Sequence, residues 1–245
     1  MRPSQPSPLI DSTTRLAVLP QIRHWVLWPA GLAAGLIIVG LTLSAVRALT
    51  AADLGIDQTL SLNHTAFLTA IALTLNALFS PLGGSFLLAV VCLFLAVARR
   101  SPVNAAAVGA VSLVGWLSSE VLKAVVGRHR PDASLLAHPL VTERGFDSFP
   151  SGHTCLAVSL SIALYFLARG TRWQRLTMIG GGLLSISVAA SRIYLGAHYP
   201  SDVAASFVAS LAAILFFSGL WNRYAASLLS RLGLIHRPDL CRESV

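Results

Sequence analysis

Long apolar runs separated by short polar segments dominate the hydrophobic pattern of this chain. A transmembrane helix needs about 20 apolar residues to cross the hydrocarbon core of a bilayer, with a range of about 17 to 25. The runs that approach this length are residues 25–46, 82–98, 104–122, 152–168, 176–190 and 203–221. They predict an all-α fold, a polytopic membrane bundle of six transmembrane helices.

A seventh apolar run, residues 65–80, is short for a span and is separated from the next run by the segment SPLGGS. Its polar residues Thr65, Thr69, Asn76 and Ser80 fall near one stripe of a helix. A short helix with one polar face is typical of the membrane interface. We therefore expect an interfacial or re-entrant helix near 65–80.

The arginines indicate the orientation of the chain, because cytoplasmic segments of membrane proteins are enriched in Arg and Lys. If 65–80 does not cross, one side receives both tails, Arg99, Arg100 and the three arginines between 169 and 175. Arg47 contradicts this pattern, and the basic residues left on the outer side, Lys123, Arg128, Arg130 and Arg192, also run against it. We expect six spans, with both termini in the cytoplasm. The predicted organisation is a polar tail over 1–22, one membrane domain over 23–222 and a basic tail over 223–245.

The composition supports a membrane protein and argues against nucleic acid as a partner. Of the 245 residues, 55% are hydrophobic and only 11% are charged, with a mean hydropathy of +0.70, which excludes an ordinary soluble domain. The net charge of +8 comes from arginines scattered at the ends of apolar runs, not from a basic cluster. The three cysteines show no paired spacing, so we expect neither a disulfide framework nor a metal knuckle.

Three polar segments lie on the predicted outer side: KAVVGRHRP at 123–131, PSGH at 150–153 and SRIYLGAHYPSD at 191–202. Each has a simple structural reading when taken alone. The first could be the basic end of a helix, the second a capped helix start, and the third a His–Asp pair at a helix start. Because the topology places all three on one side of the membrane, we expect them to converge.

Convergence would build an anion site. It would gather the cations Lys123, Arg130 and Arg192 around a helix N-terminus at Ser151 and Gly152. A phosphoryl group in transfer spreads negative charge over its oxygens, and fixed cations can stabilise that charge in place of a metal. No carboxylate cluster suited to Mg²⁺ is evident in the sequence. The residues predict metal-independent phosphoryl transfer with no cofactor.

Two histidines and one aspartate can divide the proton transfers. A neutral imidazole attacks phosphorus through its unprotonated nitrogen, and a carboxylate bonded to the other nitrogen fixes that tautomer. His198 and Asp202, four residues apart at a helix start, suit this pairing. His153, beside a helix N-terminus, is placed to protonate the leaving oxygen and later to activate water.

The pattern KxxxxxxRP, PSGH and SRxxxxxHxxxD resembles the type 2 phosphatidic acid phosphatase and vanadium haloperoxidase superfamily. The positions that match are Lys123, Arg130, Pro131, Pro150, Ser151, Gly152, His153, Ser191, Arg192, His198 and Asp202. The resemblance implies a helical bundle with its site at the outer membrane face and a phosphohistidine intermediate. It implies His198 as nucleophile, Asp202 as its partner and His153 as general acid. The implied phosphate-binding residues are Lys123, Arg130, Ser151, Gly152 and Arg192.

The expected function is that of an integral membrane lipid phosphatase. It would hydrolyse phosphate monoester or pyrophosphate groups of lipids in the outer leaflet, with the site facing the periplasm or cell exterior of a bacterial inner membrane. Undecaprenyl pyrophosphate, phosphatidic acid, phosphatidylglycerol phosphate and lipid A phosphates are candidate substrates. The alternatives are a lipid-to-lipid phosphotransferase with the same intermediate, a haloperoxidase that holds vanadate, and a non-catalytic lipid-phosphate transporter. Six spans without a soluble domain argue against the haloperoxidase.

Several residues between the motifs carry weaker expectations. Arg128 and His129 are expected to contact the lipid headgroup, and Glu120 is expected to offset the charge of Lys123 three residues later. The loop 132–147 is expected to influence the choice of substrate.

Overall fold

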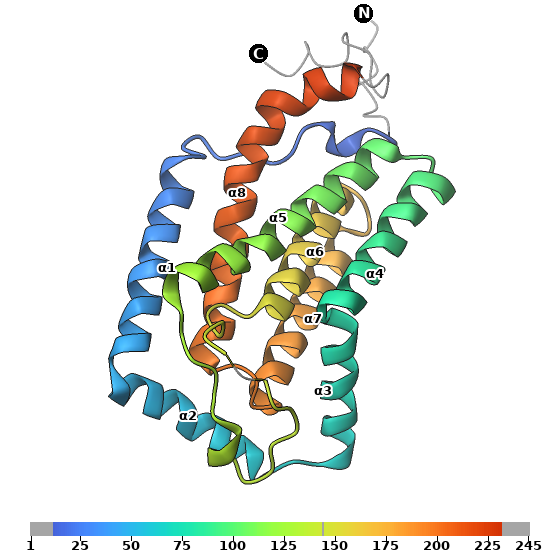
Figure 1. Ribbon diagram of the computed structural model, residues 1–245. Coiled ribbons are helices and arrows are strands. Elements are labelled where there is room, and N and C mark those ends of the chain that lie inside the picture. Colours follow the sequence, from blue (N-terminus) through green and yellow to red (C-terminus); the bar gives the residue numbers. More distant parts are fainter. Residues whose placement is uncertain (1–11, 144, 232–245) are drawn as a thin grey trace, which may run out of the picture.

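The computed structural model describes residues 12–143 and 145–231, and every regular element in this part of the chain is helical (Figure 1). The elements are η1 (Arg15–Ala17), α1 (Leu27–Ala45), α2 (Arg47–Ser61), α3 (Ala66–Phe79), α4 (Pro81–Leu93), η2 (Phe94–Ala98), α5 (Pro102–Val126), η3 (Ala133–Leu135), α6 (Gly152–Ala168), α7 (Gln174–Tyr194) and α8 (Pro200–Arg231). The element η2 is a π-helical turn that prolongs α4.

Five helices in the described part of the chain are long and apolar enough to cross a membrane: α1, α4 with η2, α5, α7 and α8. Helices α3 and α6 are also apolar but shorter, with 14 and 17 residues. The prediction of an all-α membrane bundle is therefore confirmed. The count of six spans stays a prediction, because α6, the sixth predicted span, is shorter than the other five.

Helix α2 lies across one end of the bundle, whereas α3 runs lengthwise below α4 along one side (Figure 1). Ser80 ends α3 and caps α4, its hydroxyl accepting a hydrogen bond of 3.1 Å from the Gly83 N–H. The polar stripe of α3 faces α7: the hydroxyls of Thr69 and Tyr194 lie 3.0 Å apart, and Arg192 donates to Asn76. Packing against α7 therefore accounts for the stripe that suggested an interfacial helix.

Local signals in the sequence set the helix ends that surround the loop after α5. Helix α5 ends at Gly127, whose left-handed backbone (φ 59°) favours glycine. Ser151 caps α6 by accepting from the Thr154 N–H, and α8 begins at Pro200, which suits the first turn of a helix. These ends fix where the three motif segments begin and stop.

The N-terminal segment packs at the end of the bundle opposite the motif segments. The Trp221 indole donates to the carbonyl oxygen of Leu16 over 3.1 Å, and Leu16 is only 2% exposed. Asp202 and Trp221 lie at opposite parts of α8, about 28 Å apart along its axis. This distance is close to the thickness of a bilayer hydrocarbon core, about 30 Å.

The described residues include parts of both predicted tails. Residues 12–22 fold back on the bundle, with Leu16 and Leu19 buried, and residues 1–11 lie outside the described part of the chain. Helix α8 continues to Arg231, so the predicted boundary between 222 and 223 falls inside a helix. Residues 232–245 of the predicted basic tail lie outside the described residues.

Candidate active site

The structure brings the three motif segments together at one end of the bundle. They come from the end of α5 and the following loop, from the start of α6, and from the end of α7 through the start of α8. Arg130 Nη1 lies 3.3 Å from His198 Nε2, which joins the first and third segments. Lys123 Nζ lies beside Gly152, where an added Cβ would meet it at 3.5 Å. The predicted convergence is confirmed by these contacts.

His198 is buried and held in one tautomer. Its Nδ1 donates a hydrogen bond of 2.7 Å to the carbonyl oxygen of Ser148, and its ring is 1% exposed. Because Nδ1 carries the proton, the lone pair lies on Nε2, on the side of Arg130. A nucleophilic imidazole needs this arrangement.

The surroundings of His198 also favour its neutral form. Burial lowers the pKa of His198 well below its usual value, and the nearby charges of Arg192 and Arg130 lower it further. An imidazole that stays neutral keeps its lone pair available for attack. The electrostatics of the site therefore support the same role as its hydrogen bonds.

Asp202 supports His198 indirectly. Its Oδ2 lies 3.7 Å from His198 Nδ1, beyond hydrogen-bond distance, and accepts instead from the Ser148 hydroxyl over 2.6 Å. The Tyr199 N–H also donates to Oδ2, over 3.0 Å. The direct His198–Asp202 bond expected from the spacing is thus replaced by a link through Ser148, whose carbonyl fixes the tautomer.

Arg128 is buried behind the site and does not reach a headgroup position. It donates to Asp202 over 2.6 Å and to Asp53 of α2 over 2.8 Å, and its guanidinium stacks on the Tyr199 ring at 4.3 Å. The side chain is 2% exposed. Arg128 therefore joins α2 to the aspartate at the start of α8. The sequence shows Arg128 within a motif segment but contains no signal for its pairing with Asp53.

The guanidiniums of Arg130 and Arg192 face a shared carboxylate. Arg130 is held on one side by both oxygens of Asp147, at 2.8 and 3.0 Å. Glu143 accepts from Arg130 Nη1 through Oε2 and from Arg192 Nη2, over 2.7 Å, through Oε1. Arg192 also donates to Asn76 of α3. The predicted phosphate-binding arginines are close together, and a loop carboxylate bridges them.

The two loop carboxylates stay ionised because of these arginines. Hydrogen bonds from Arg130 lower the pKa of Asp147 to about 2. Burial tends to raise the pKa of Glu143, but the charges of Arg192 and Arg130 outweigh burial and hold that pKa below its usual value. Both side chains are therefore anionic at neutral pH.

Lys123 and the α6 N-terminus complete the cluster of positive charge. Lys123 Nζ bonds Glu120 over 2.8 Å, as expected for a helix pair three residues apart. The Ser151 N–H donates to Ser206, so it is occupied. The N–H groups of Gly152 and His153 in the first turn have no acceptor within the helix and can meet an anion.

His153 lies at the same centre. Its ring forms a hydrogen bond with the backbone of Asn76 and lies near Arg192 and His198. Its Nε2 is buried with no hydrogen-bond partner in the described structure. This nitrogen is therefore free to meet a leaving group. Asn76, which touches both His153 and Arg192, is a site residue that sequence reasoning missed, although it belonged to the polar stripe.

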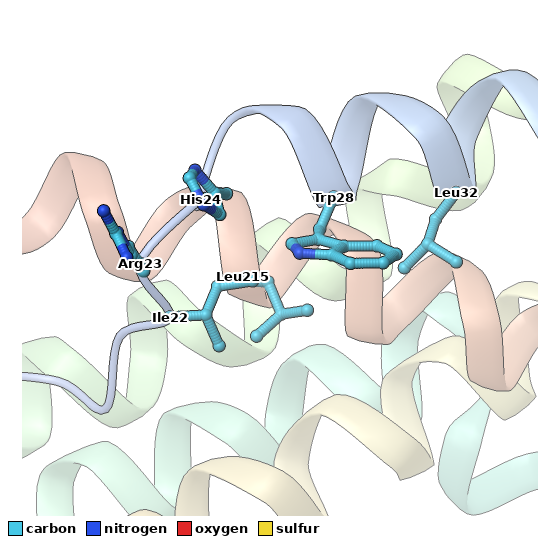
Figure 2. Close-up of a pocket in the computed structure, with 6 residues that line it drawn as sticks. All are labelled: Ile22, Arg23, His24, Trp28, Leu32 and Leu215. Atoms are coloured by element: carbon cyan, nitrogen blue, oxygen red, sulfur yellow. The ribbon is translucent and has the colours of Figure 1, made fainter.

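A separate pocket of about 330 Å³ lies between helix α8 on one side and, on the other, the start of α1 with the segment before it (Figure 2). Its lining is Ile22, Arg23, His24, Trp28, Leu32 and Leu215. Its lining contains none of the motif residues. The described residues contain no group of three or more His, Cys, Asp or Glu side chains that could hold a metal ion.

Comparison with known proteins identifies this arrangement. The model of the PAP2 superfamily matches residues 104–225, a range that contains all three motif segments. This chain belongs to the PAP2 superfamily. The resemblance inferred from the motifs is confirmed.

The PAP2 chain is similar to several curated lipid phosphatases. It is 38% identical over 106 residues to phosphatidylglycerophosphatase B of Bacillus subtilis, covering 41% of this chain and 49% of the relative. It is 34% identical over 110 residues to undecaprenyl-diphosphatase BcrC of Bacillus subtilis, covering 44% and 54%. It is 31% identical over 130 residues to lipid A 1-phosphatase of Rhizobium etli, covering 50% of each chain. The matches span about half the length of these relatives.

A solved structure extends the similarity beyond the motifs. The crystal structure of a transmembrane PAP2 type phosphatidylglycerolphosphate phosphatase from Bacillus subtilis superposes with a TM-score of 0.64 at 26% identity. The superposition covers 82% of this chain and 96% of that chain. The PAP2 chain therefore shares most of its helical arrangement with that phosphatase, including helices outside the matched motifs.

Proposed function

We propose that this protein is a membrane lipid phosphatase that acts through a phosphohistidine at His198. The observation that carries the proposal is the buried, neutral His198, whose unprotonated Nε2 lies 3.3 Å from Arg130 at a cluster of cations. The relatives named as phosphatidylglycerophosphatase, undecaprenyl-diphosphatase and lipid A 1-phosphatase support lipid phosphates as the substrate class.

In the first step, His198 Nε2 attacks the phosphorus and the bond to the lipid oxygen breaks. Arg130, Arg192 and Lys123 stabilise the charge on the transferring group, together with the N–H groups at the start of α6. Protonated His153 donates its proton to the leaving oxygen, so a lipid alcohol or a shortened lipid phosphate departs.

In the second step, His153 takes a proton from water, and that water attacks the phosphohistidine. The N–P bond breaks, inorganic phosphate leaves, and His198 regains its lone pair. His153 is again protonated, which completes the cycle without a net change in the protein. The bond from Nδ1 to the Ser148 carbonyl keeps the same tautomer throughout.

The proposed setting is a bacterial inner membrane, with the site at the periplasmic or outer face and both termini in the cytoplasm. The distribution of arginines supports this orientation. The length of α8 between Asp202 and Trp221, about one hydrocarbon thickness, supports placing the site and the N-terminal segment at opposite faces. Substrates would then present their phosphates from the outer leaflet.

The test is phosphate release from a panel of lipid phosphates by the detergent-purified protein in the presence of EDTA. The wild type is expected to release phosphate, whereas His198→Ala should lose activity by at least about 1,000-fold. His153→Ala should lose about 100- to 10,000-fold. Activity that requires a divalent metal, or that survives in His198→Ala, would falsify the mechanism. Free phosphate as the main product distinguishes hydrolysis from transfer to a lipid acceptor.

A further inference from the structure

The Glu143 carboxylate occupies the position between Arg130 and Arg192. One oxygen accepts from Arg192 and the other from Arg130, so both oxygens are used. The two arginines come from different segments, the loop after α5 and the end of α7. A single carboxylate thus neutralises two neighbouring guanidiniums, as a bridging oxyanion would.

The donors that Glu143 holds are those a phosphoryl group would need. Asp147 accepts hydrogen bonds from Nε and Nη2 of Arg130, and Asn76 accepts one from Nη1 of Arg192. The remaining terminal nitrogens, Arg130 Nη1 and Arg192 Nη2, are the two that bond Glu143. Arg130 Nη1 is also the nitrogen 3.3 Å from His198 Nε2. A phosphoryl group within reach of His198 would therefore meet the donors of the Glu143 bridge.

The site also contains unpartnered polar atoms. Arg192 Nε and His153 Nε2 are buried and have no hydrogen-bond partner in the described structure. Buried polar atoms without partners are costly and often mark the place of a missing ligand. Glu143 supplies only two oxygens, so it satisfies the arginines in part and leaves these atoms for a larger anion.

We propose that Glu143 is an intramolecular occupant of the phosphate site, which substrate must displace, and that it thereby sets the affinity and charge selectivity of the site. The inference rests on the proposed phosphate site at His198. A phosphate dianion brings more oxygens and more charge than a carboxylate and can replace it. A monoanion with weak hydrogen bonds cannot.

The exposure of Glu143 suits a group that leaves and returns. Its side chain is 32% exposed, whereas Arg128 and Asp202 of the permanent pair behind the site are 2% and 0% exposed. The Glu143 loop is anchored by the Arg130 N–H, which donates to the Gly145 carbonyl over 3.2 Å, and by Asp147. Glu143 can therefore turn into water while its loop and the Arg130–Asp147 pair stay in place.

Arg192 needs this counter-charge in the phosphate-free protein, because its side chain is fully buried. A buried charge without a partner is strongly destabilising. Removing the Glu143 charge should thus have two effects of opposite sign: weaker stability of the phosphate-free protein and tighter binding of phosphate. If Glu143 merely held the arginines in place, its replacement would lower both the stability of the protein and its affinity for phosphate.

The experiment is calorimetric titration of inorganic phosphate into the detergent-purified full chain, with thermal unfolding with and without phosphate. Glu143→Gln is expected to lower the phosphate Kd about tenfold, lower the Tm without phosphate, and recover that Tm when phosphate is added. The matched control is Asp147→Asn. This variant removes one carboxylate from Arg130 but leaves the Glu143 bridge. Its phosphate Kd should therefore fall by a factor several times smaller than in Glu143→Gln. Nitrate should bind the wild type weakly, and its affinity should increase in Glu143→Gln.

An unchanged or weaker phosphate affinity in Glu143→Gln would overturn the proposal, as would an equal gain in Asp147→Asn. If Glu143→Gln does not purify, Glu143→Asp, whose shorter arm cannot reach both arginines, is expected to gain affinity as well. Binding is measured without turnover. A protein that binds phosphate as described but hydrolyses no lipid phosphate would refute the proposed function and leave this inference standing.

Discussion

His198 takes its orientation from a backbone group and its electrostatic support from side chains. The Ser148 carbonyl accepts from Nδ1, while Asp202 lies 3.7 Å away and bonds Ser148, Tyr199 and Arg128 instead. A backbone carbonyl remains when side chains are replaced. The tautomer of His198 should therefore survive the loss of the Asp202 charge.

Asp202→Asn is accordingly expected to lower kcat by about 10- to 100-fold, the scale of a hydrogen bond to a charged group, and by far less than His198→Ala. The measurement is kcat on the best lipid phosphate of the panel, with Tm as a check on folding. Ser148→Ala, which keeps the carbonyl and loses only the hydroxyl, should be milder still. Equal inactivity of Asp202→Asn and His198→Ala in folded protein would show that a direct His–Asp contact is needed.

At the residue scale, the sequence predicts which side chains converge but not which partners they choose. Lys123, Arg130 and His198 could be grouped because their motifs and the span count place them on one side. Glu143 and Asn76 could not, because their contacts with Arg192 join segments of unrelated spacing. Such pairs depend on how α3 and a long loop pack, which no periodicity encodes.

In the described part of the chain, α2 is the one long helix that the hydrophobic pattern did not predict. Its buried residues are Asp57 and Ser61, so the face turned inward is polar. Asp53 on the same helix pairs with Arg128. Its apolar residues, such as Leu49 and Ile56, lie on the exposed side, and its many polar residues keep it from standing out as an apolar run. The same feature makes α2 sensitive to pH.

Asp57 should make the stability of α2 fall as pH rises. The side chain is 1% exposed, and neither carboxylate oxygen has a hydrogen-bond partner in the described structure. Burial raises the pKa of Asp57 to about 8, with contributions from Asp53 and Asp202 that Arg128 opposes. The unfolded chain releases this proton near pH 4. Stability is therefore full below about pH 4 and is lost progressively up to about pH 8.

The side chain of Asp57→Asn stays neutral at every pH, so this variant should not lose stability as the pH rises. Its gain in free energy of unfolding over the wild type, obtained from thermal unfolding in detergent, should grow between pH 5 and pH 8 to at most about 4 kcal/mol and then level off. Asp53→Asn is the control, since it breaks the ion pair with Arg128 and should lower Tm throughout this range. A difference between Asp57→Asn and wild type that does not change with pH would contradict the assignment.

At the scale of the whole molecule, the apolar runs predict the helices but not their functional ends. Helix α5 continues past the run 104–122 through Lys123 to Val126, and α8 begins at Pro200, before the run 203–221. Hydrophobicity excludes these polar ends, yet they carry site residues such as Lys123 and Asp202. The prediction is therefore weakest at the end of the bundle where the chemistry is proposed.

The orientation of the bundle can be tested by labelling single cysteines from outside intact cells, after Cys92, Cys155 and Cys241 are replaced. Ser134→Cys, on the exposed loop beside the site, should be labelled by a membrane-impermeant maleimide. Arg99→Cys, exposed at the opposite end, should react only after the membrane is permeabilised.

Arg99 is chosen over its neighbour Ser101, which is 3% exposed and whose hydroxyl donates to the Thr13 carbonyl over 2.6 Å. The reverse labelling pattern would place the site in the cytoplasm and exclude lipids of the outer leaflet. Equal labelling of both positions from outside would leave no membrane between the two ends. That result would contradict the crossing distance that α8 provides between Asp202 and Trp221.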